Sequence, residues 1–495
     1  MKKIILTICL AVTAVLALQA ETFTGNIVVT RNGQTNNAIA TVTVTQQSDG
    51  LNTLVLQVPG FGTMTMNDVH SAYRKGVTVY SAERDVTTLF GDMRTIVFAR
   101  TIDGMMAANV AIPAQNTTMW FNTVGDHFQM PNSDMEDWNS SYANEPSRWH
   151  GFKSASGALA SFSPAVLEKS QSVHPTANGQ YSAVVVAKSV FGVVANGTMT
   201  NGRLNAGSMS ASDSTNNYAA SVQTFGNDFY MPLNAKPDVF RVLLKYKPGV
   251  NNPDNSYRAK VSVKTFDGTY YQEPFPAGTS SYSNVSGSIV GGQIAPCEWT
   301  EFLFPFNYDN YAANGAETNA IFVTFSTNIK PGTGASNDSL YIDEIVLQYL
   351  GAMTDLRYQG TTINGWDPAV TTYSMQMAGE PNLDDFDATI EGVDALLLKS
   401  MEQNADGSYR IAISVVSADL QNAACYIINV TAPAGIKGDV DDNGLLNISD
   451  VTTLINYLLS NNADGINMDN ADVDSDGHIN ISDVTTLINK LLSGN

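Results

Sequence analysis

Two twelve-residue segments near the C-terminus, 439–450 and 472–483, carry oxygen-bearing side chains at a regular spacing. A calcium ion takes six to eight oxygen ligands, and a loop of this length supplies them from positions 1, 3, 5, 7, 9 and 12 around a glycine at position 6. In the first segment these positions are Asp439, Asp441, Asn443, the Leu445 carbonyl, Asn447 and Asp450, with Gly444 at the turn. In the second they are Asp472, Asp474, Asp476, the His478 carbonyl, Asn480 and Asp483, with Gly477 at the turn. The spacing therefore predicts two calcium sites.

Each segment runs into an amphipathic pattern, and the two copies are almost identical. Residues 447–460 read NISDVTTLINYLLS and residues 480–493 read NISDVTTLINKLLS, so the copies lie 33 residues apart and differ only at Tyr457 and Lys490. Apolar residues at i, i+3, i+4 and i+7 predict one helix after each loop. The expected buried stripes are Val451, Leu454, Ile455 and Leu458, and Val484, Leu487, Ile488 and Leu491. No helical pattern precedes either loop, which predicts two half EF-hands.

This duplicated loop-helix unit resembles a type I dockerin over residues 435–495. The resemblance implies a cohesin-like protein domain as the partner. It also implies that positions 10 and 11 of each loop set partner choice, which here are Ile448, Ser449, Ile481 and Ser482. Because the copies are identical there, two docking orientations related by an internal twofold would be equivalent. A solvated acidic tail is the alternative, but it would need neither the register nor the repeat.

Charge and the N-terminus narrow the partners and the compartment. The formal net charge is -21, ten Asp stand against one Lys from Gly438 onward, and no basic patch occurs elsewhere, which argues against nucleic acid or an anionic membrane as partner. Residues 1–20 combine a basic start with a short apolar run, which predicts a signal peptide cut after Ala20. The run is too short for a transmembrane segment, and no lipobox accompanies Cys9. We expect a secreted, cell-surface or periplasmic protein that is not a lipoprotein.

Strand patterns fill residues 21–125 and 351–434 on either side of a longer central region. The first alternates β-branched and polar residues, with Asn32-Gly33 and Asp49-Gly50 as hairpin turns, which predicts an antiparallel barrel or sandwich. Its opening hairpins resemble the calycin-like, lipocalin-type domains. In the second, the runs 364–375 and 425–431 resemble the bacterial Ig-like or cadherin-like sandwich that serves as a spacer, with 431–437 as the linker to the tail.

Residues 126–350 carry an ordered series of motifs, at 130–138, 149–157, 188–208, 242–249, 322–327 and 337–347. The series is similar to the "putative carbohydrate metabolism domain", a β-jelly-roll family of secreted proteins. The resemblance implies carbohydrate as ligand, and the jelly-roll shape shared with carbohydrate-binding modules implies one structural calcium, at Asp134, Glu136 and Asp343. The alternative is that Asp343 and Glu344 merely flank a strand end facing water. The predicted fold class is thus mainly β and multidomain, with a small all-α calcium-binding tail.

The sequence offers no clear catalytic constellation. Glycoside hydrolysis needs two carboxylates facing each other, whereas the neighbours Glu136 and Asp137, or Asp343 and Glu344, would point to opposite faces of a strand. Glu298 and Glu301 flank Trp299, the five His lack zinc spacing, and no Gly-x-Ser-x-Gly elbow occurs. Sugar binding requires less, and the candidate stacking residues are Trp138, Trp149 and Trp299, although most aromatic residues in strands belong to a core.

Three functions follow from these features. The favoured prediction is an exported glycan-binding protein with a calcium-dependent docking tail and no assigned catalytic residue. A glycoside hydrolase, which would be an O-glycosyl hydrolase, or an accessory protein in polysaccharide catabolism is the first alternative. A non-catalytic surface adhesin or scaffold component is the second.

Overall fold

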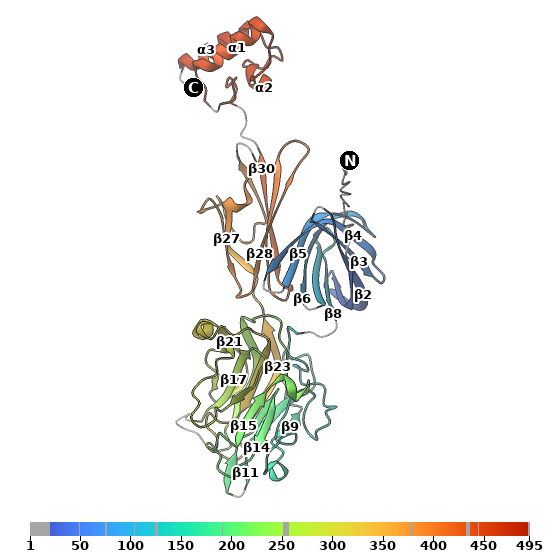
Figure 1. Ribbon diagram of the computed structural model, residues 1–495, viewed down its shortest axis with the longest axis vertical. Coiled ribbons are helices and arrows are strands. Elements are labelled where there is room, and N and C mark those ends of the chain that lie inside the picture. The colour runs from blue at the N-terminus through green and yellow to red at the C-terminus, as the bar shows by residue number, and fades with distance from the viewer. Residues whose placement is uncertain are drawn as a thin grey trace, which may run out of the picture. The chain divides into compact units, whose positions relative to one another are not determined.

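The computed structural model describes residues 20–48, 50–74, 77–102, 104–123, 127–190, 192–250, 257–377, 380–431, 436–443 and 445–493. The predicted signal peptide, Asp49, Gly444 and most of the predicted linker lie outside the described residues. Strands dominate up to Thr431 and helices follow (Figure 1), which confirms the predicted mainly β fold. The chain divides into two compact units, one of 1–355, 388–398 and 414–424 and one of 356–387, 399–413 and 425–495. The four-domain division remains a prediction.

The N-terminal strands form a closed antiparallel barrel in which each strand pairs with the next and β8 pairs back with β1. Its strands are β1 (Ala20–Arg31), β2 (Gln34–Gln46), β3 (Asn52–Val58), β4 (Gly62–Arg74), β5 (Val77–Thr88), β6 (Gly91–Ile102), β7 (Met105–Ile112) and β8 (Thr117–Thr123).

Alternation and two turn positions explain this closure. Apolar residues such as Ile27 and Val29 point into the barrel, while the residues between them are more exposed. Asn32 and Gly33 both have positive φ, 49° and 77°, as the predicted Asn-Gly hairpin requires. A Cβ on Gly25 would lie 2.1 Å from the Asn122 carbonyl oxygen, so only glycine lets β1 approach β8 closely enough to close the barrel.

The central region is an antiparallel sandwich, as expected of a jelly-roll. One ten-stranded sheet supplies both layers: β13, β22, β17 and β19 form the first layer with β20 beside β17, and β21, β16, β23, β10 and β9 form the second. The strands are β9 (Leu167–Ser170), β10 (Ser182–Val186), β13 (Thr198–Thr200), β16 (Val239–Lys247), β17 (Ala259–Phe266), β19 (Val285–Ile289), β20 (Gln293–Ile294), β21 (Cys297–Asn307), β22 (Ala320–Ser326) and β23 (Ser339–Gln348). We call these the first and second layers below.

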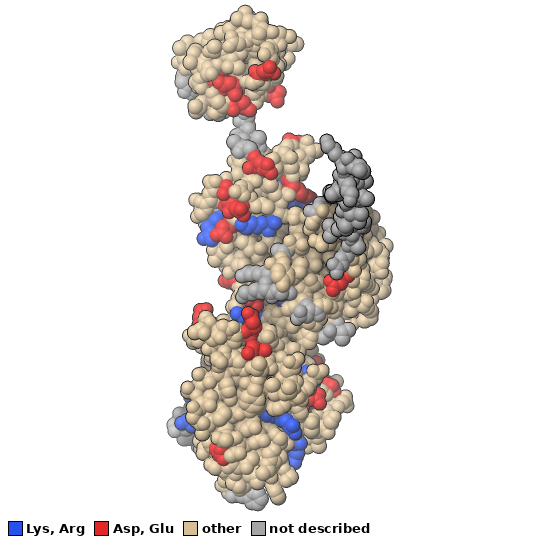
Figure 2. Space-filling model, viewed as in Figure 1, with Lys and Arg blue, Asp and Glu red and all other residues tan. Residues whose placement is uncertain are grey.

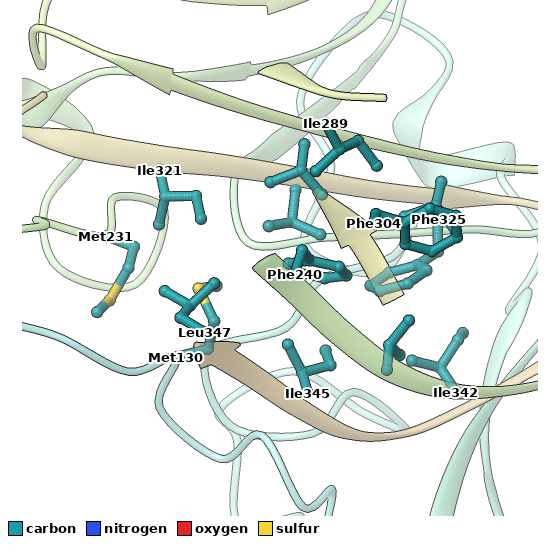
Figure 3. Close-up of a cluster of buried hydrophobic side chains, with 14 of the residues drawn as sticks. Met130, Met231, Phe240, Ile289, Phe304, Ile321, Phe325, Ile342, Ile345 and Leu347 are labelled. Atoms are coloured by element: carbon teal, nitrogen blue, oxygen red, sulfur yellow. The ribbon is translucent and has the colours of Figure 1, made fainter. Parts of the chain in front are cut away.

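Side chains from both layers meet in one core. Phe325 and Ile321 of β22 face Phe240 of β16 and Ile342 of β23 across it (Figure 3), and all four are completely buried. Two small sheets lie beside the sandwich, one of β11 (Lys188–Val190) and β12 (Val193–Ala195), the other of β14 (Arg203–Ala206), β15 (Asn217–Ser221) and β18 (Tyr271–Glu273). The core thus packs against the inner faces of both layers. Their outer faces are left for binding.

A third β region follows the sandwich. One sheet contains β24 (Ala352–Tyr358), β25 (Thr361–Thr362) and β27 (Phe386–Glu391), and the other contains β26 (Thr372–Gln376), β28 (Leu396–Gln403), β29 (Tyr409–Val416) and β30 (Ala423–Thr431). Strand β26 runs parallel to β30, while Trp366 stacks on Tyr373 with ring centroids 5.7 Å apart. Two sheets of three and four strands agree with the predicted Ig-like sandwich.

Within the first unit, the barrel is hydrogen-bonded to other segments through buried polar side chains. The Arg100 guanidinium of β6 donates to the Ala418 and Asn234 carbonyls and lies over the Phe128 ring. Burial lowers the pKa of Arg100 from its usual value. Because an arginine that is only 5% exposed needs partners for its donors, these carbonyls must stay in place.

The C-terminal tail contains α1 (Ile448–Ser460), α2 (Met468–Ala471) and α3 (Ile481–Ser493). Helices α1 and α3 are those predicted from the repeat. The single turn α2 precedes the second loop and was not predicted, because four residues are too few to show a helical period. None of the described helices is long and apolar enough to cross a lipid bilayer.

Candidate metal centres and binding surfaces

The first predicted calcium loop brings its carboxylates together. Carboxylate oxygens of Asp439, Asp441 and Asp450 all lie within 4.8 Å of one another. Two oxygens that bind one calcium at 2.3–2.6 Å can be at most about 5 Å apart, so this group fits the ion. Asp439 is 2% exposed and Asp450 is fully buried, and burying such charges without a cation would be strongly unfavourable. These residues would hold the ion.

The second loop repeats this arrangement with one difference. Asp472, Asp474 and Asp476 form its group within 4.8 Å, and the buried Asp483 is not part of that group among the described residues. The remaining ligand positions match between the loops. Asn447 Nδ2 donates to the Leu445 carbonyl and Asn480 Nδ2 to the His478 carbonyl, both at 3.2 Å. The placement of positions 7 and 9 is therefore the same in both copies.

The last residue of each loop also starts the following helix. Asp450 Oδ2 accepts the Asn447 N–H at 2.8 Å while Asn447 Oδ1 accepts the Ser449 N–H at 2.7 Å, which caps α1. Asp483 accepts the Asn480 N–H in the same way at 2.8 Å. A shorter Asp in place of the usual Glu thus joins loop and helix directly. Figure 2 shows acidic side chains on the visible face of this domain.

The apolar stripe of each helix differs from the prediction at one position. Val451, Leu454, Val484 and Leu487 are buried between the helices as expected. Ile455 and Ile488 are 37% and 38% exposed, so their assignment to the buried stripe is wrong. At 100° per residue, Ile455 lies within about 20° of Ile448 on the helix surface, about 40° from Val451 and about 100° from Leu454. It belongs to a second apolar row.

This second row is exposed and occurs in both copies; we call the two rows the docking rows. The first is Ile448, Ile455 and Leu459, exposed by 72%, 37% and 82%, and the second is Ile481, Ile488 and Leu492, exposed by 70%, 38% and 81%. Ser449 and Ser482 beside them are also exposed. The four predicted partner-contacting residues therefore lie on the surface, and Ile448 and Ile481 extend into apolar rows of the kind that mark interaction sites.

The only difference between the helices lies off these rows. Lys490 Nζ donates to the Lys437 carbonyl at 2.6 Å, and Lys437 Nζ donates in turn to the Asp472 carbonyl at 2.6 Å. Tyr457 takes the place of Lys490 in the first copy. The second copy is thus fastened to the start of the domain, while the docking rows remain equivalent.

The predicted second metal site is only partly assembled. Asp343 is 1% exposed and its Oδ2 has no hydrogen-bond partner. Burial, together with the nearby carboxylates of Glu344, Glu136 and Asp134, raises its pKa to about 7. Glu136 Oε1 instead accepts the Gln180 and Tyr181 N–H groups, both at 2.7 Å. Among the described residues, Asp134, Glu136 and Asp343 do not form a group of oxygens within 4.8 Å.

The three tryptophans predicted to stack on sugar have different surroundings. Trp149 is completely buried in the sandwich core and donates Nε1–H to the Pro131 carbonyl at 3.2 Å, so the prediction for it is wrong. Trp138 is half-buried, packs against the same core and donates to the Met135 carbonyl. Trp149 therefore offers no free ring face, and Trp138 is held against the core by the loop that carries it.

Trp299 is different, because it lies on the outer face of the second layer. Its ring contacts Tyr341 and His174 edge-to-face, with centroids 6.1 and 6.4 Å away. Lys245 lies over the Tyr341 ring and pairs with Glu298 at 2.5 Å. We call Trp299, Tyr341 and His174 the aromatic platform. A half-exposed aromatic surface with charged neighbours suits the mixed apolar and hydroxyl surface of a sugar.

The carboxylate pairs considered for hydrolysis are occupied by structural contacts. Glu298 pairs with Lys245 and Glu301 with Arg241 on the second layer. The lysine holds the pKa of Glu298 below its usual value, which opposes a role as proton donor. Asp137 accepts the Asn139 N–H, and this hydrogen bond lowers the pKa of Asp137. Among the described residues, no two carboxyl groups face each other across an open site with one pKa raised and the other lowered.

A cleft over the first layer was missed from the sequence. Its volume is about 270 Å³, and its floor includes Lys260 and Ser262 of β17 with Thr324 and Ser326 of β22. The signal that could have found it is the alternation in AKVSVKTF, where polar residues occupy every second position of a strand with a buried opposite face. Its walls come from distant segments and leave no local pattern.

Comparison with known proteins supports the assignment of the tail. Residues 437–492 match the model of the dockerin type I domain. No curated protein matches the chain. Among solved structures, a protein from Bacteroides thetaiotaomicron described as a "putative glycoside hydrolase" aligns at 13% identity over 51% of this chain and 86% of its own, with a TM-score of 0.32. A structure of infectious bursal disease virus aligns at 11% identity over 67% and 72%, with a TM-score of 0.14.

Calcium removal should unfold the tail and leave the β regions folded. Each ion present at a thousand times its Kd would stabilise the folded tail by about 4 kcal/mol, and EDTA removes this contribution. Helices α1 and α3 contain only 13 residues each, so the loss of far-ultraviolet circular dichroism will be small. Hydrogen exchange over 448–460 and 481–493 is the sharper measurement. Unchanged exchange there in EDTA would contradict the prediction.

In calcium-free solution the sandwich should become less stable as the pH rises. The folded pKa of Asp343, about 7, lies above its usual 3.8, so the folded state keeps a proton that the unfolded state has released. Stability therefore falls between about pH 4 and pH 7 and is constant above that range. Asp343→Asn should raise the unfolding midpoint by a few degrees at about pH 8 and by less at about pH 5.

Tryptophan fluorescence can follow this transition, because Trp138, Trp149 and Trp299 all belong to the sandwich. Asp309→Asn, an exposed carboxylate of the same region, is the matched control. Equal midpoints for Asp343→Asn and the wild type at both pH values would show that the buried carboxyl carries no penalty.

Proposed function

We propose that this chain is an exported, carbohydrate-associated modular protein that binds glycan through its sandwich and is held by a partner through its dockerin. The pair of exposed docking rows on two calcium-dependent helices supports the second part best. An unpartnered row of this kind would cost solubility unless something covers it. The partner is a cohesin-like domain whose surface accepts isoleucine and leucine side chains.

The internal repeat gives this docking a specific form. The two docking rows lie one repeat apart along the chain and contain the same residue types. The single difference between the two helices, Tyr457 versus Lys490, lies outside these rows. A partner that accepts one row therefore accepts the other after a twofold rotation. Two equivalent orientations double the observed association constant relative to either one alone.

Glycan binding is assigned to the aromatic platform. Trp299 and Tyr341 come from β21 and β23, two rigid strands on either side of β16, and Lys245 of β16 lies between them. Rings held on strands lose little freedom when they bind, which favours affinity. The paired carboxylates beside the platform supply hydrogen-bond acceptors for hydroxyls rather than an acid and base for hydrolysis.

A cation at Asp343 completes the proposal. The buried Asp343 carboxylate accepts the Glu344 N–H through Oδ1, but its Oδ2 has no partner. Together with nearby Asp134, Glu136 and Glu344 it has an excess of negative charge that one calcium would balance. Calcium should then raise the sandwich midpoint of the wild type above about pH 7 and leave Asp343→Asn unchanged. That measurement extends the pH series described above.

Docking can be tested with the full chain and an immobilised type I cohesin domain. Ile448→Asp or Ile481→Asp should each lower affinity by about twofold, because one orientation survives. The double variant should lose about 100-fold or more, as expected when a central apolar contact is replaced by a charge in both orientations. Asn462→Asp, exposed beyond the end of α1, adds the same charge as a control. A loss of about 100-fold from either single variant, or a loss in the double variant no larger than the product of the two single losses, would refute the equivalent orientations.

A glycan array probed with the full chain tests the platform. Trp299→Ala should weaken binding to the preferred glycan by about tenfold, the equivalent of one lost ring contact. Tyr73→Ala removes an aromatic ring that is 76% exposed in the barrel and serves as the control. A reducing-sugar assay on the same ligands decides against the hydrolase alternative if no product forms. Binding that Trp299→Ala leaves unchanged would move the site away from the platform.

A further inference from the structure

The cleft over the first layer, introduced above, has a polar floor built from adjacent strands. Thr198 of β13, Ser326 of β22 and Lys260 of β17 are direct neighbours in register, and Thr324 and Ser262 form the next row. Val261, Val263, Val323 and Phe325 point the other way into the core. Four hydroxyl groups and one ammonium group therefore share one face, fixed by strands that the core holds rigid.

Two polar atoms at this cleft have no hydrogen-bond partner. They are the Thr324 hydroxyl and Asn196 Oδ1, both of residues that line the cleft. Asn196 Nδ2 donates to Ser326 Oγ at 3.2 Å and to the Lys330 carbonyl at 3.4 Å. Because a carbonyl only accepts, the amide cannot turn without losing the second bond. An unsatisfied polar atom costs about 1–3 kcal/mol. A ligand that supplies the missing partners would recover this energy.

The cleft also carries one charge of each sign in positions open to a ligand. Lys260 Nζ forms no hydrogen bond or ion pair with any described residue. Glu273 Oε1 accepts the Ser262 hydroxyl at 2.9 Å and the Tyr271 hydroxyl at 2.7 Å, and no described residue donates to Oε2. The lysine can pair with an oxyanion, while Glu273 Oε2 can accept a hydroxyl.

The walls of the cleft are apolar. Phe162, Met209 and Ile329, from three separate loops, are 64%, 50% and 36% exposed along its rim. Val193 and Val194 of the β11–β12 hairpin extend this wall. A ligand must therefore present hydroxyls and an anionic group to the floor and C–H surface to the walls.

We propose that this cleft binds an acidic sugar residue of the uronic acid type. Its carboxylate pairs with Lys260, its hydroxyls donate to Glu273 Oε2 and Asn196 Oδ1, and Thr324 donates to a ring or hydroxyl oxygen. The apolar face of the pyranose ring lies against the rim. A fatty acid would leave the hydroxyl floor unpaired, and a neutral sugar would leave the lysine unpaired, so neither fits as well.

The cleft would bind the sugar but would not hydrolyse it by a two-carboxylate mechanism. Glu273 is the only acidic side chain in the described lining, whereas that mechanism needs an acid and a second carboxylate. The inference rests on the proposed function in expecting a glycan ligand, but it uses a different layer from the aromatic platform. The two can therefore fail independently.

The test is calorimetric titration of the full chain with trigalacturonic acid and with neutral galactotriose. The wild type should bind the acid, and Lys260→Met, which keeps the aliphatic stem, should lower that affinity by about tenfold or more. Lys330→Met removes an equal charge from the loop at the rim without touching the lining, and should change affinity by less than about twofold. Trp299→Ala should leave the affinity for trigalacturonic acid unchanged.

A second variant separates binding from folding. Thr324→Val removes a hydroxyl that has no partner in the free protein, so the unfolding midpoint should stay the same or rise. Its affinity for trigalacturonic acid should nevertheless fall by about threefold or more.

Three results would overturn the proposal: no binding of the acidic sugar by the wild type, equal losses from Lys260→Met and Lys330→Met, or loss with Trp299→Ala alone. The first leaves glycan binding at the platform untouched, because the array reports on it separately.

Discussion

Carboxylates that the fold places away from water constrain this protein more than any other interaction. Asp450 and Asp483 are fully buried, and each must join a loop to a helix while carrying a charge. Backbone N–H groups share part of that charge, but Asp439 and Asp441 crowd against Asp450, and only a cation offsets the repulsion. The tail is therefore folded conditionally. The β regions have apolar cores that need no ion, and Asp343 only adds a local dependence on pH and cation.

The sequence was a reliable guide where one short segment determines the outcome. The helices after the two loops and the Asn32-Gly33 turn depend on neighbours within a dozen residues, and they were found where predicted. The loop ligands depend on equally local spacing and remain a prediction. Ile455 and Ile488 were misplaced for a related reason. An i+4 residue lies at the edge of an apolar stripe. Whether the opposing helix covers it depends on how much of the stripe that helix contacts, and the periodicity of one helix does not show this.

Features that are assembled from distant segments could not be predicted from the sequence. Trp149 looked as suitable for sugar as Trp299, because nothing in its local sequence shows that the loop carrying it packs into the sandwich core. The cleft combines strands β13, β17 and β22 with three loops that are spread over residues 162–329. Its unpaired Thr324 hydroxyl becomes visible only once those neighbours are in place, since a threonine in a strand is unremarkable by itself.

Charge placement makes the outer faces of the two layers of the sandwich chemically different. On the second layer, Lys245 and Glu298 neutralise each other beside aromatic rings, which leaves a surface suited to neutral ligands. On the first, Lys260 stands unpaired among hydroxyls, and the nearest acid of the lining is already engaged through one oxygen. A lysine that is paired with a glutamate within the fold is not available to bind an anionic ligand. An unpaired lysine in a cleft can pair with the anionic group of a ligand. Under the functions proposed above, a chain fixed to its partner by the docking rows presents two chemically distinct sugar surfaces, and they differ in whether a lysine is paired within the fold.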